Sequence, residues 1–347
     1  MKSIKQLLRP NILNLQPYSS ARDEFTGAAS VFLDANENPF NEPYNRYPDP
    51  NQRVLKDKIA CLKGVDAAQI FLGNGSDEPI DLLFRAFCEP GKDNVVSIDP
   101  TYGMYQVAAN INNIEVRRVL LTDDFELDVP ALLKCCDDKT KMLFICSPNN
   151  PTGNCFAKED ILTLIRGFEG LVVLDEAYID FCPQKSLLQE LQEFPNLVIL
   201  QTFSKAWGMA GIRLGMAFAS SEIVKVLSKI KYPYNINVLT QEKAMELLER
   251  ESDKEDWVQV LLAQRSWLAQ QLEQFQFVSK VYPSDANYLL VQVDDANAIY
   301  SFLVGKQIII RNRSTVSLCA GCLRITIGQP GENRLLLDAL ASYGQQK

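Results

Sequence analysis

Short apolar runs recur along the first two thirds of the chain, separated by longer amphipathic stretches. Five of these runs are almost wholly apolar and lie at 95–98, 142–146, 171–174, 197–200 and 216–219. Such runs are typical of strands buried on both faces of a parallel sheet. Between two of them, residues 158–168 place apolar side chains at helical spacing. Strands that alternate with helices predict an α/β domain with a mainly parallel sheet.

The pattern changes after about residue 240. A long helical stretch at 240–275 precedes short strands expected near 287–293, 308–311 and 323–327, and a final helix is expected after Pro330. We therefore expect a large domain over residues 31–240 and a smaller α+β domain over 241–347. Residues 1–30 are expected to form an N-terminal arm that joins the small domain.

The composition of the chain limits the classes of protein to which it can belong. The chain has 347 residues, of which 47% are hydrophobic and 22% charged, as in ordinary globular proteins. No apolar run reaches the roughly 18 residues of a membrane span, and the N-terminus lacks the features of a secretory signal, so we expect a cytoplasmic protein. The net charge of −8 argues against a nucleic-acid partner.

The chain contains no histidine, which excludes Ser-His-Asp and Cys-His hydrolases and zinc–histidine sites. Proton transfer must then fall to Lys, Tyr, Asp, Glu or Cys. The nine cysteines show no disulfide-like spacing, and we expect reduced thiols. The CxxC pair Cys319 and Cys322 has no second pair nearby and is interpreted as two incidental thiols.

Polar motifs follow several of the expected strands. After Phe71 and Leu72 comes GNGSDEPID, whose glycines permit a tight turn and whose Ser76 and Asp77 lead into a helix. Backbone N–H groups at such a helix start form a phosphate cradle. This motif alone is weak evidence, because an ordinary strand–helix connection has the same form.

The other motifs supply complementary groups. Asn150 lies in the proline-flanked SPNNPTG, Asp175 ends a buried strand in DEAYIDF with Tyr178 three residues on, and Lys205 follows a strand in QTFSK. Arg213 comes eight residues after Lys205. A poorly hydrated lysine loses its proton readily, and the neutral amine attacks carbonyl groups. A carboxylate buried at a strand end requires a cationic partner.

Each of these residues has an ordinary structural explanation when taken alone; most lysines, for example, are solvated surface charges. Ligands of open α/β sheets, however, collect at the carboxyl ends of the strands, where all four motifs fall. A phosphate cradle, an amide, a carboxylate with a phenol, and an amine with an arginine match the requirements of pyridoxal 5′-phosphate. We therefore favour a cofactor site over four unrelated loops.

The chain resembles the fold-type-I pyridoxal-phosphate aminotransferases over essentially its whole length. The resemblance rests on SPNNPTG at 147–153, DEAYIDF at 175–181 and TFSKAWGMAGIRLG at 202–215. The pairing of RYPD at 46–49 with LRITIG at 323–328, together with ANENP around Asn36, indicates the histidinol-phosphate branch. It implies a large domain with a mainly parallel seven-stranded sheet flanked by helices, plus a smaller α+β domain.

The resemblance also implies roles for individual residues. Lys205 would bond the cofactor and move the substrate proton, Asp175 would pair with the ring nitrogen, and Tyr178 and Asn150 would bind the ring's 3′-oxygen. Tyr102 would stack on the ring. The implied phosphate-binding residues are Ser76, Asp77, Thr202, Ser204 and Arg213, with Tyr47 reaching the site from the neighbouring subunit of a homodimer.

The implied substrate-binding residues are Tyr18, Asn36, Arg311 and Arg324. Arg324 would take the α-carboxylate of glutamate, and Arg324, Arg311 and Tyr18 the phosphate of the second substrate. Independently of the resemblance, Arg324 alternates with apolar neighbours, so its side chain should point away from the core face of its strand. Arg313 is interpreted as a solvated charge. Glu37, Glu176 and Asp180 are interpreted as solvated or salt-bridging groups, with no metal site.

The expected reaction is the exchange of an amino group between L-histidinol phosphate and 2-oxoglutarate, a step of histidine biosynthesis. A threonine-phosphate decarboxylase and an aromatic amino-acid aminotransferase of the same fold are alternatives. A non-catalytic regulator that senses an amine is a further one, although such proteins typically carry a DNA-binding domain for which this acidic chain has no room.

Overall fold

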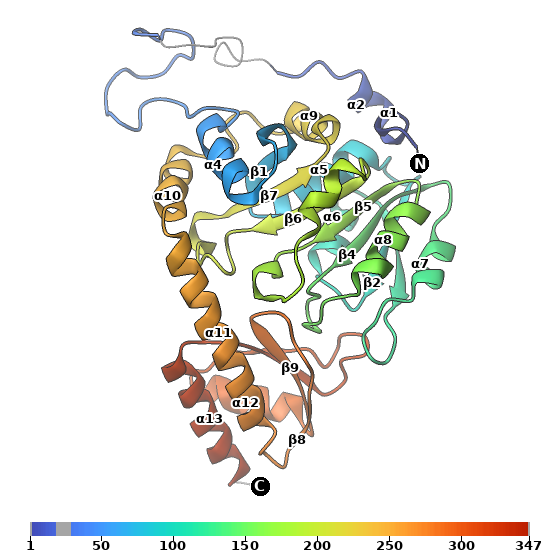
Figure 1. Cartoon of the computed structure of the whole chain (residues 1–347), viewed down its shortest axis with the longest axis vertical. Helices are drawn as coiled ribbons and strands as arrows, with labels where there is room; N and C mark the ends of the chain where they lie inside the picture. Colours follow the sequence, from blue (N-terminus) through green and yellow to red (C-terminus); the bar gives the residue numbers. More distant parts are fainter. Residues whose placement is uncertain (1, 19–28, 346–347) are drawn as a thin grey trace.

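The computed structural model describes residues 2–18 and 29–345. It contains a seven-stranded sheet formed by residues before 220 and a four-stranded sheet formed by residues after 277. Figure 1 shows the two sheets in separate bodies, with the long helix α11 (Glu251–Leu272) running from one to the other. Within the described ranges, no helix is both long and apolar enough to cross a membrane.

The larger sheet has the strand order β1-β7-β6-β5-β4-β2-β3. Its strands are β1 (Ile70–Asn74), β2 (Asn94–Asp99), β3 (Glu115–Leu120), β4 (Thr140–Cys146), β5 (Leu171–Asp175), β6 (Leu197–Thr202) and β7 (Leu214–Ala219). Strands β2 to β6 pair in parallel, and β7 runs antiparallel to both of its neighbours. The predicted mainly parallel sheet is confirmed.

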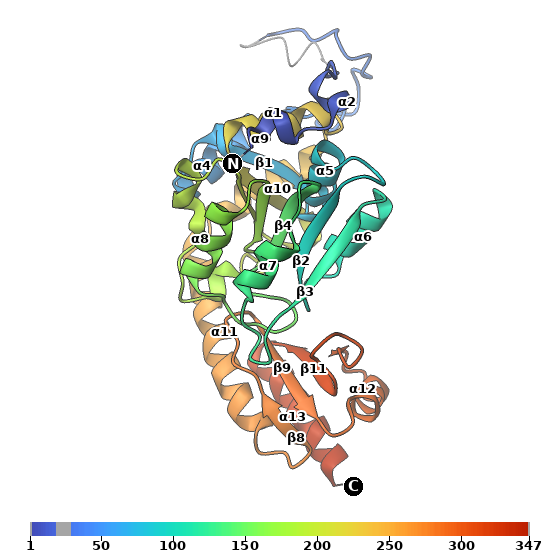
Figure 2. The same cartoon turned by 90° about the vertical axis from the view of Figure 1, so that its right-hand side faces the viewer.

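Helices cover both faces of this sheet, as Figure 2 shows. They are α4 (Arg53–Lys63), α5 (Asp77–Phe87), α6 (Met104–Ile111), α7 (Val129–Cys135), α8 (Lys158–Gly167), α9 (Ser221–Ile230) and α10 (Val238–Leu248), with short 3₁₀ turns η1 (Ala67–Gln69), η2 (Ile179–Phe181), η3 (Leu187–Gln192) and η4 (Ala210–Ile212). Alternate residues of the central strands join two separate apolar cores, one on each face. This double burial explains why the strands are almost wholly apolar.

Strand β3 is absent from the sequence prediction. Its sequence EVRRVL carries charged residues, and all six of its residues are exposed or half-buried. The strand lies at the edge of the sheet, where only one neighbour pairs with it. Charged side chains are common on such edges because they discourage pairing with another chain. The apolar pattern used for the other strands therefore does not apply here.

The smaller body contains β8 (Val278–Val281), β9 (Tyr288–Val293), β10 (Arg311–Asn312) and β11 (Cys322–Thr326), with α12 (Ala296–Gly305) and α13 (Pro330–Gly344). Its strand order is β10-β11-β9-β8, and its strands pair in antiparallel fashion. Its own apolar core includes Leu268 of α11, Leu323, Ile325 and Leu340. The predicted small α+β domain is confirmed.

The long helix predicted over 240–275 is two helices. α10 ends at Leu248 and α11 begins at Glu251, with Glu249 and Arg250 between them. Ala244 and Leu248 of α10 pack into the core of the large sheet. The boundary between the two bodies therefore falls at the start of α11 rather than at residue 240.

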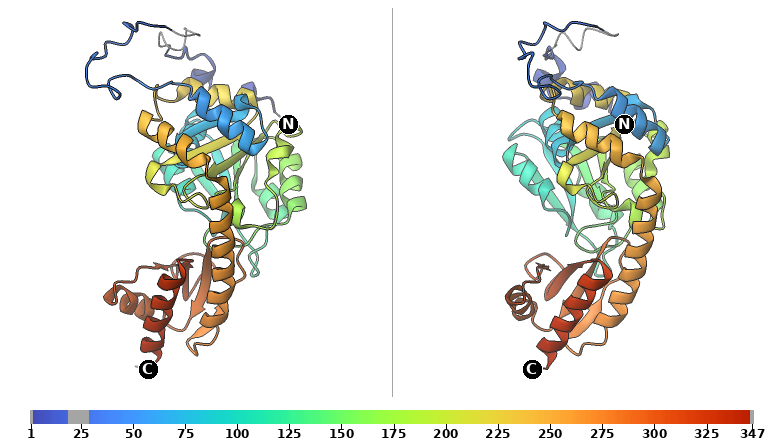
Figure 3. Two further views of the ribbon diagram at one scale, coloured as in Figure 1. Left: turned by 60° about the vertical axis from the view of Figure 1, so that its left-hand side comes forward. Right: turned by 90° about the vertical axis from the view of Figure 1, so that its left-hand side faces the viewer.

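The N-terminal arm lies on the large body, not on the small domain as expected. Ile4 of α1 (Ile4–Leu7) and Leu7 join the core on one face of the large sheet. The backbone N–H of Arg9 donates to Ala86, and Lys229 Nζ donates to the carbonyl oxygen of Ile12 in α2 (Pro10–Leu13). The left panel of Figure 3 shows the arm at the end of the molecule opposite the small domain. Residues 19–28 of the arm lie outside the described residues.

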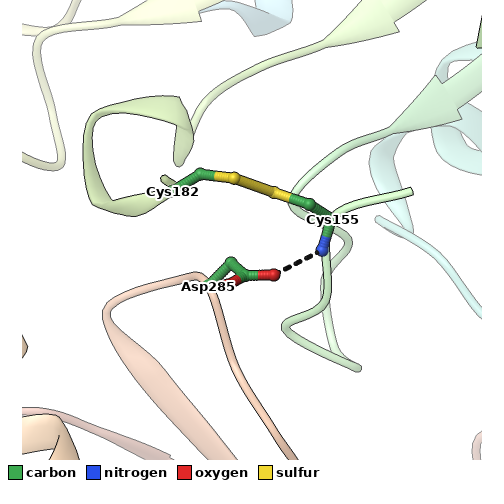
Figure 4. A group of neighbouring side chains, drawn as sticks. All are labelled: Cys155, Cys182 and Asp285. Atoms are coloured by element: carbon green, nitrogen blue, oxygen red, sulfur yellow. Dashed lines mark hydrogen bonds between the residues drawn. A yellow bond between two sulfur atoms is a disulfide. The ribbon is translucent and has the colours of Figure 1, made fainter. Parts of the chain in front are cut away.

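Two cysteines correct the expectation that all thiols are reduced. Cys155 and Cys182 form a disulfide, and the other seven cysteines are free. Figure 4 shows Asp285 of the small domain beside this bond, where its carboxylate accepts the backbone N–H of Cys155 at 2.9 Å. These three residues are also the one group of metal-ligand type within the described ranges. The disulfide joins the segments that follow β4 and β5.

Candidate active site

An open pocket lies at the carboxyl ends of β4, β5 and β6. β1 ends at the same edge, and the antiparallel β7 begins there. The pocket is lined by Gly75, Ser76, Asp77, Tyr102, Cys146, Asn150, Asp175, Ala177, Tyr178, Thr202, Ser204, Lys205 and Arg213. Every predicted cofactor-binding residue except Tyr47 is in this set.

The turn between β1 and α5 offers backbone donors to the pocket. Helix α5 begins after Ser76 without a side-chain cap, so the N–H groups of its first turn are available to a ligand. Gly75 has φ +69°, and a Cβ there would lie 2.6 Å from a nitrogen of Arg213. A Cβ on Gly215 would lie 2.2 Å from the backbone nitrogen of Ser76. Both glycines are therefore required by close packing at the turn.

Arg213 supplies positive charge at this turn. The backbone of Arg213 has a φ of 57°, and its guanidinium lies 3.7 Å from the carboxylate of Asp77. Asp77 also accepts the hydroxyl of Tyr102 at 3.1 Å. Ser204 and Thr202 lie across the pocket with their hydroxyls hydrogen-bonded to each other at 3.0 Å. Hydroxyls, a guanidinium and free N–H groups at one place form a binding site for a phosphate.

Asp175 is buried at the end of β5, with 2% of its surface exposed. Its two oxygens accept the Tyr105 hydroxyl at 2.7 Å and the Ala177 N–H at 3.0 Å. Burial raises the pKa of Asp175, and these two hydrogen bonds oppose the rise. Among the described residues, no cationic side chain forms an ion pair with it. A carboxylate held in this way could receive a cationic N–H group from a ligand.

The two neighbouring asparagines in the loop after β4 have different environments. Asn149 is fully buried, and its amide bonds the carbonyl oxygen of Pro100 and the Thr152 hydroxyl, both at 2.9 Å. Asn150 lines the pocket, and its side-chain oxygen accepts a hydrogen bond from Arg324. Its NH₂ group is consequently left to donate into the pocket. Asn149 thus fixes the loop, whereas Asn150 lines the pocket.

Lys205 projects into the pocket, 5.4 Å from the ring centre of Tyr178. Burial lowers its pKa from the usual 10.5, and the nearby guanidinium of Arg324 lowers it further. Across the described part of the chain, its Nζ makes no hydrogen bond or ion pair. Partial burial and the lack of an ion-paired carboxylate both make it easier for this amine to lose its proton. The neutral amine is the nucleophilic form.

Tyr178 forms one wall of the pocket. Its ring meets Tyr288 edge to face at 5.2 Å. Burial raises the pKa of Tyr178, so its hydroxyl stays protonated.

Five predicted site residues do not line this pocket, and Arg324 of β11 is one of them. Tyr18 lines a different pocket, and 74% of its surface is exposed. Asn36 is also exposed. Tyr47 is 50% exposed and stacks on Tyr234 at 4.5 Å. Arg311 is exposed on β10, directly opposite Arg324 of β11. Tyr18, Asn36 and Tyr47 all lie in the first 47 residues, which one chain alone does not bring to its own pocket.

Arg324 lies where its alternating pattern predicts. Leu323 and Ile325 enter the small-domain core, and the guanidinium of Arg324 lies on the other side, over the ring of Tyr288 at 5.2 Å. Arg313 differs from the prediction: it is half-buried rather than solvated, and its Nε is fully buried without a hydrogen bond in the described structure.

Two of the other acidic residues have the salt-bridging role interpreted from the sequence, whereas Glu176 is neither solvated nor ion-paired in the described structure. Glu37 pairs with Arg46 at 2.8 Å, and Asp180 lies 3.6 Å from Lys254. Glu176 is buried and accepts hydrogen bonds from Ser186, Leu187 and Gln201. Cys319 and Cys322 are buried free thiols.

Tyr105 is the site residue that sequence reasoning missed. It is 1% exposed, stacks on Phe144 at 4.8 Å and donates its hydroxyl to Asp175. The sequence feature that could have indicated Tyr105 is its position in DPTYGMY, three residues after Tyr102. A second tyrosine so close to a ring-stacking candidate could have been tested as a partner for the buried carboxylate.

Three comparisons with known proteins agree with this geometry. The family model described as Aminotransferase class I and II matches residues 22–340. The histidinol-phosphate aminotransferase of Parabacteroides distasonis is 62% identical over 340 residues, which cover 98% of this chain and 99% of that protein. The corresponding crystal structure from Clostridium acetobutylicum has a TM-score of 0.81 at 25% identity and covers 88% of this chain and 92% of its own. The Sinorhizobium meliloti enzyme, solved in complex with pyridoxal-5′-phosphate, has a TM-score of 0.80 at 24% identity, with 87% and 83% covered.

Proposed function

The chain belongs to the class I and II aminotransferases, and from that premise we propose that it is a pyridoxal-phosphate-dependent histidinol-phosphate aminotransferase. It exchanges an amino group between L-histidinol phosphate and 2-oxoglutarate, giving imidazole acetol phosphate and L-glutamate. The 62% identity to a relative of that name over nearly the whole of both chains supports the substrate. The same likeness disfavours the decarboxylase, the aromatic aminotransferase and a non-catalytic regulator.

The residues of the pocket fit the cofactor. The uncapped start of α5, with Ser76 and Arg213, suits its phosphate. Asp175, a buried carboxylate without an ion-pair partner among the described residues, suits the protonated ring nitrogen. Asn150 and Tyr178 carry donors at the same pocket wall and suit the 3′-oxygen. When bound, pyridoxal phosphate supplies an aldehyde that bonds amino groups and a ring that withdraws electrons from the carbon being deprotonated.

The single observation that carries the proposal is the placement of Lys205. Its amine, whose pKa is lowered by burial, shares one pocket with Asp175 and the phosphate-binding turn. With the cofactor bound, this amine would hold its aldehyde carbon and would move the proton of the substrate carbon that bears nitrogen. No histidine exists to take that proton. Asp175 keeps its negative charge in place through the hydroxyl of Tyr105.

The substrate is held by the small domain. Arg324 reaches the pocket wall by donating to Asn150, and a guanidinium there binds the α-carboxylate of glutamate in a bidentate manner. Arg311, opposite Arg324 in the sheet register, lies farther out and binds the phosphate of histidinol phosphate together with it. Arg324 thus binds the α-carboxylate of glutamate in one half of the reaction and helps to bind the substrate phosphate in the other half.

The working form is a cytoplasmic homodimer. Tyr47 is predicted to contact the cofactor phosphate, yet it is exposed and lies outside this chain's own pocket. Tyr18 and Asn36 are likewise outside it. A second copy that contributes these residues accounts for all three positions, and large exposed apolar side chains such as Val31, Leu33 and Phe40 lie on the same segment.

The proposal is tested by an amine panel assayed with 2-oxoglutarate as acceptor. Histidinol phosphate, histidinol, phenylalanine and threonine phosphate are compared for glutamate formation and for release of CO₂. We expect glutamate formation to be fastest with histidinol phosphate, with no CO₂ release. Preferential use of phenylalanine, or CO₂ release from threonine phosphate, would contradict the proposal.

A further inference from the structure

Three arginines of the small domain share one face of its sheet. Arg311 of β10 pairs with Arg324 of β11, so these two side chains lie on the same side. The ladder continues one step beyond β10, because the backbone N–H of Arg313 donates to the carbonyl oxygen of Cys322 at 2.8 Å. Side chains two residues apart on an extended segment point to the same face, which places Arg313 beside Arg311 and Arg324.

Arg313 is set deeper than Arg311. Arg311 is exposed, whereas Arg313 is half-buried with its Nε fully buried and unbonded in the described structure. The pKa of Arg313 is lowered by burial and by the charges of Arg324 and Arg311, and its own charge is felt at the pocket residue Tyr178. The side chain is therefore within electrostatic reach of the cofactor pocket.

No anion of the described chain balances these charges. None of the three guanidiniums forms an ion pair with an acidic side chain among residues 2–18 and 29–345. The nearby groups Cys319 and Tyr178 have pKa values raised by burial or hydrogen bonding, so they stay neutral. Three like charges gathered on one face without a counter-ion are unfavourable unless an anionic ligand occupies the space between them.

From this arrangement, and resting on the proposed function, we infer that Arg313 is a further substrate-phosphate-binding residue that sets the preference for a phosphorylated amine. A phosphate monoester carries nearly two negative charges at neutral pH. Arg324 and Arg311 bind this phosphate in the proposed function, and Arg313 adds a third cation on the same face of the sheet. Because Arg313 is shielded from solvent, its attraction is screened less than that of Arg311.

The test compares Arg313→Gln and Arg313→Lys with the holoenzyme in the histidinol-phosphate, histidinol and glutamate half-reactions. For Arg313→Gln we expect kcat/KM for histidinol phosphate to fall about 10- to 100-fold, as for the loss of one charge-assisted contact. Values for histidinol and glutamate should change less than about threefold. The competitive inhibition constant of inorganic phosphate should rise in parallel. Arg313→Lys should restore part of the loss, because the charge returns without the planar fork.

The control is Arg334→Gln, which removes an exposed arginine of α13 in the same domain. Equal losses for histidinol phosphate, histidinol and glutamate would show a merely structural role and overturn the inference, as would unchanged kinetics. If the unmodified enzyme itself does not prefer histidinol phosphate to histidinol, the proposed function fails instead. The two failures are therefore distinguishable.

Discussion

At the scale of single residues, burial in the pocket disfavours charge on both of its central groups. It raises the pKa of Asp175 and lowers that of Lys205. Each group is thus driven toward its neutral form until a ligand arrives. A cationic ring nitrogen beside Asp175 and an aldehyde beside Lys205 satisfy both tendencies at once. Both pKa shifts are therefore consistent with the proposed cofactor.

Tyr105→Phe tests how Asp175 is held. The change removes a hydroxyl that donates to the carboxylate at 2.7 Å, and the pKa of Asp175 should rise further because this bond favours the charged form. The acid limb of the pH–rate profile should then move to higher pH. The free energy of unfolding should fall by about 1–3 kcal/mol, measured by urea denaturation. The matched control is Tyr300→Phe; an unmoved acid limb would contradict the assignment.

The pH dependence of cofactor capture tests Lys205. Only the neutral amine attacks the aldehyde, so the rate at which apoprotein captures pyridoxal phosphate should rise with pH and level off above the pKa of Lys205. The midpoint should lie below the usual 10.5. Arg324→Gln removes a neighbouring cation that lowers this pKa, so the midpoint should move to higher pH. Rapid-mixing absorbance measures it, and a shift to lower pH would refute the electrostatic account.

At the scale of elements, the site depends on how closely β7 passes the turn between β1 and α5. Gly73 of β1 pairs with Gly215 of β7, and the N–H of Gly75 donates to the Arg213 carbonyl at 2.7 Å. This contact fixes both the turn and the start of the strand. The phosphate-binding N–H groups and the guanidinium are consequently set by the same backbone contact.

Gly215→Ala tests this contact. Its Cβ would lie 2.2 Å from the nitrogen of Ser76, so backbone must move. We expect the dissociation constant of pyridoxal phosphate to rise about 10-fold or more and the free energy of unfolding to fall by about 1–3 kcal/mol. Gly305→Ala is the control, because a Cβ there meets nothing within 4 Å. Equal behaviour of the two variants in cofactor titration and urea denaturation would count against a role for close packing.

The elements that the sequence predicts correctly are those whose burial produces a recognisable pattern of apolar residues. Buried central strands are apolar, and parallel strands bring their ends together, so Asn150, Asp175 and Lys205 could be placed in one pocket before the structure was known. The edge strand β3 has no such signature. The break between α10 and α11 falls at Glu249 and Arg250, residues compatible with a continuous helix.

Other features depend on tertiary contacts without any local pattern. The partnership of Tyr105 with Asp175 joins residues 70 apart in sequence. The burial of Arg313 follows from its position one step beyond a two-residue strand. The docking of the N-terminal arm rests on Ile4 and Leu7, whose apolar character indicates burial without saying against which domain. The bond between Cys155 and Cys182 likewise has no signal in their spacing.

At the scale of the whole molecule, the proposed homodimer would complete the pocket of each chain. The residues predicted to finish it, Tyr18, Asn36 and Tyr47, all lie outside the pocket. Tyr47 stacks on Tyr234, and its backbone N–H donates to Glu37, so its position is ordered by its own chain. An ordered, exposed aromatic residue is well suited to enter a partner's site.

Subunit complementation tests this arrangement. Lys205→Ala subunits are inactive, and Tyr47→Ala subunits should bind the cofactor weakly. If Tyr47 serves the neighbouring site, mixing and reassociating the two variants creates heterodimers with one intact site. We expect activity above that of either variant alone, up to about a quarter of the wild-type value for random pairing of equal amounts. Activity equal to the average of the two parent variants would contradict a shared site.

The most direct test of the account is to trap the cofactor on the protein. Purified enzyme with pyridoxal phosphate is reduced with borohydride, digested and mapped by mass spectrometry. The account predicts the phosphopyridoxyl group on Lys205 and no labelled peptide in the Lys205→Ala variant. Labelling of another lysine, such as the half-buried Lys56 or the buried Lys254, or labelling unchanged in Lys205→Ala, would contradict it.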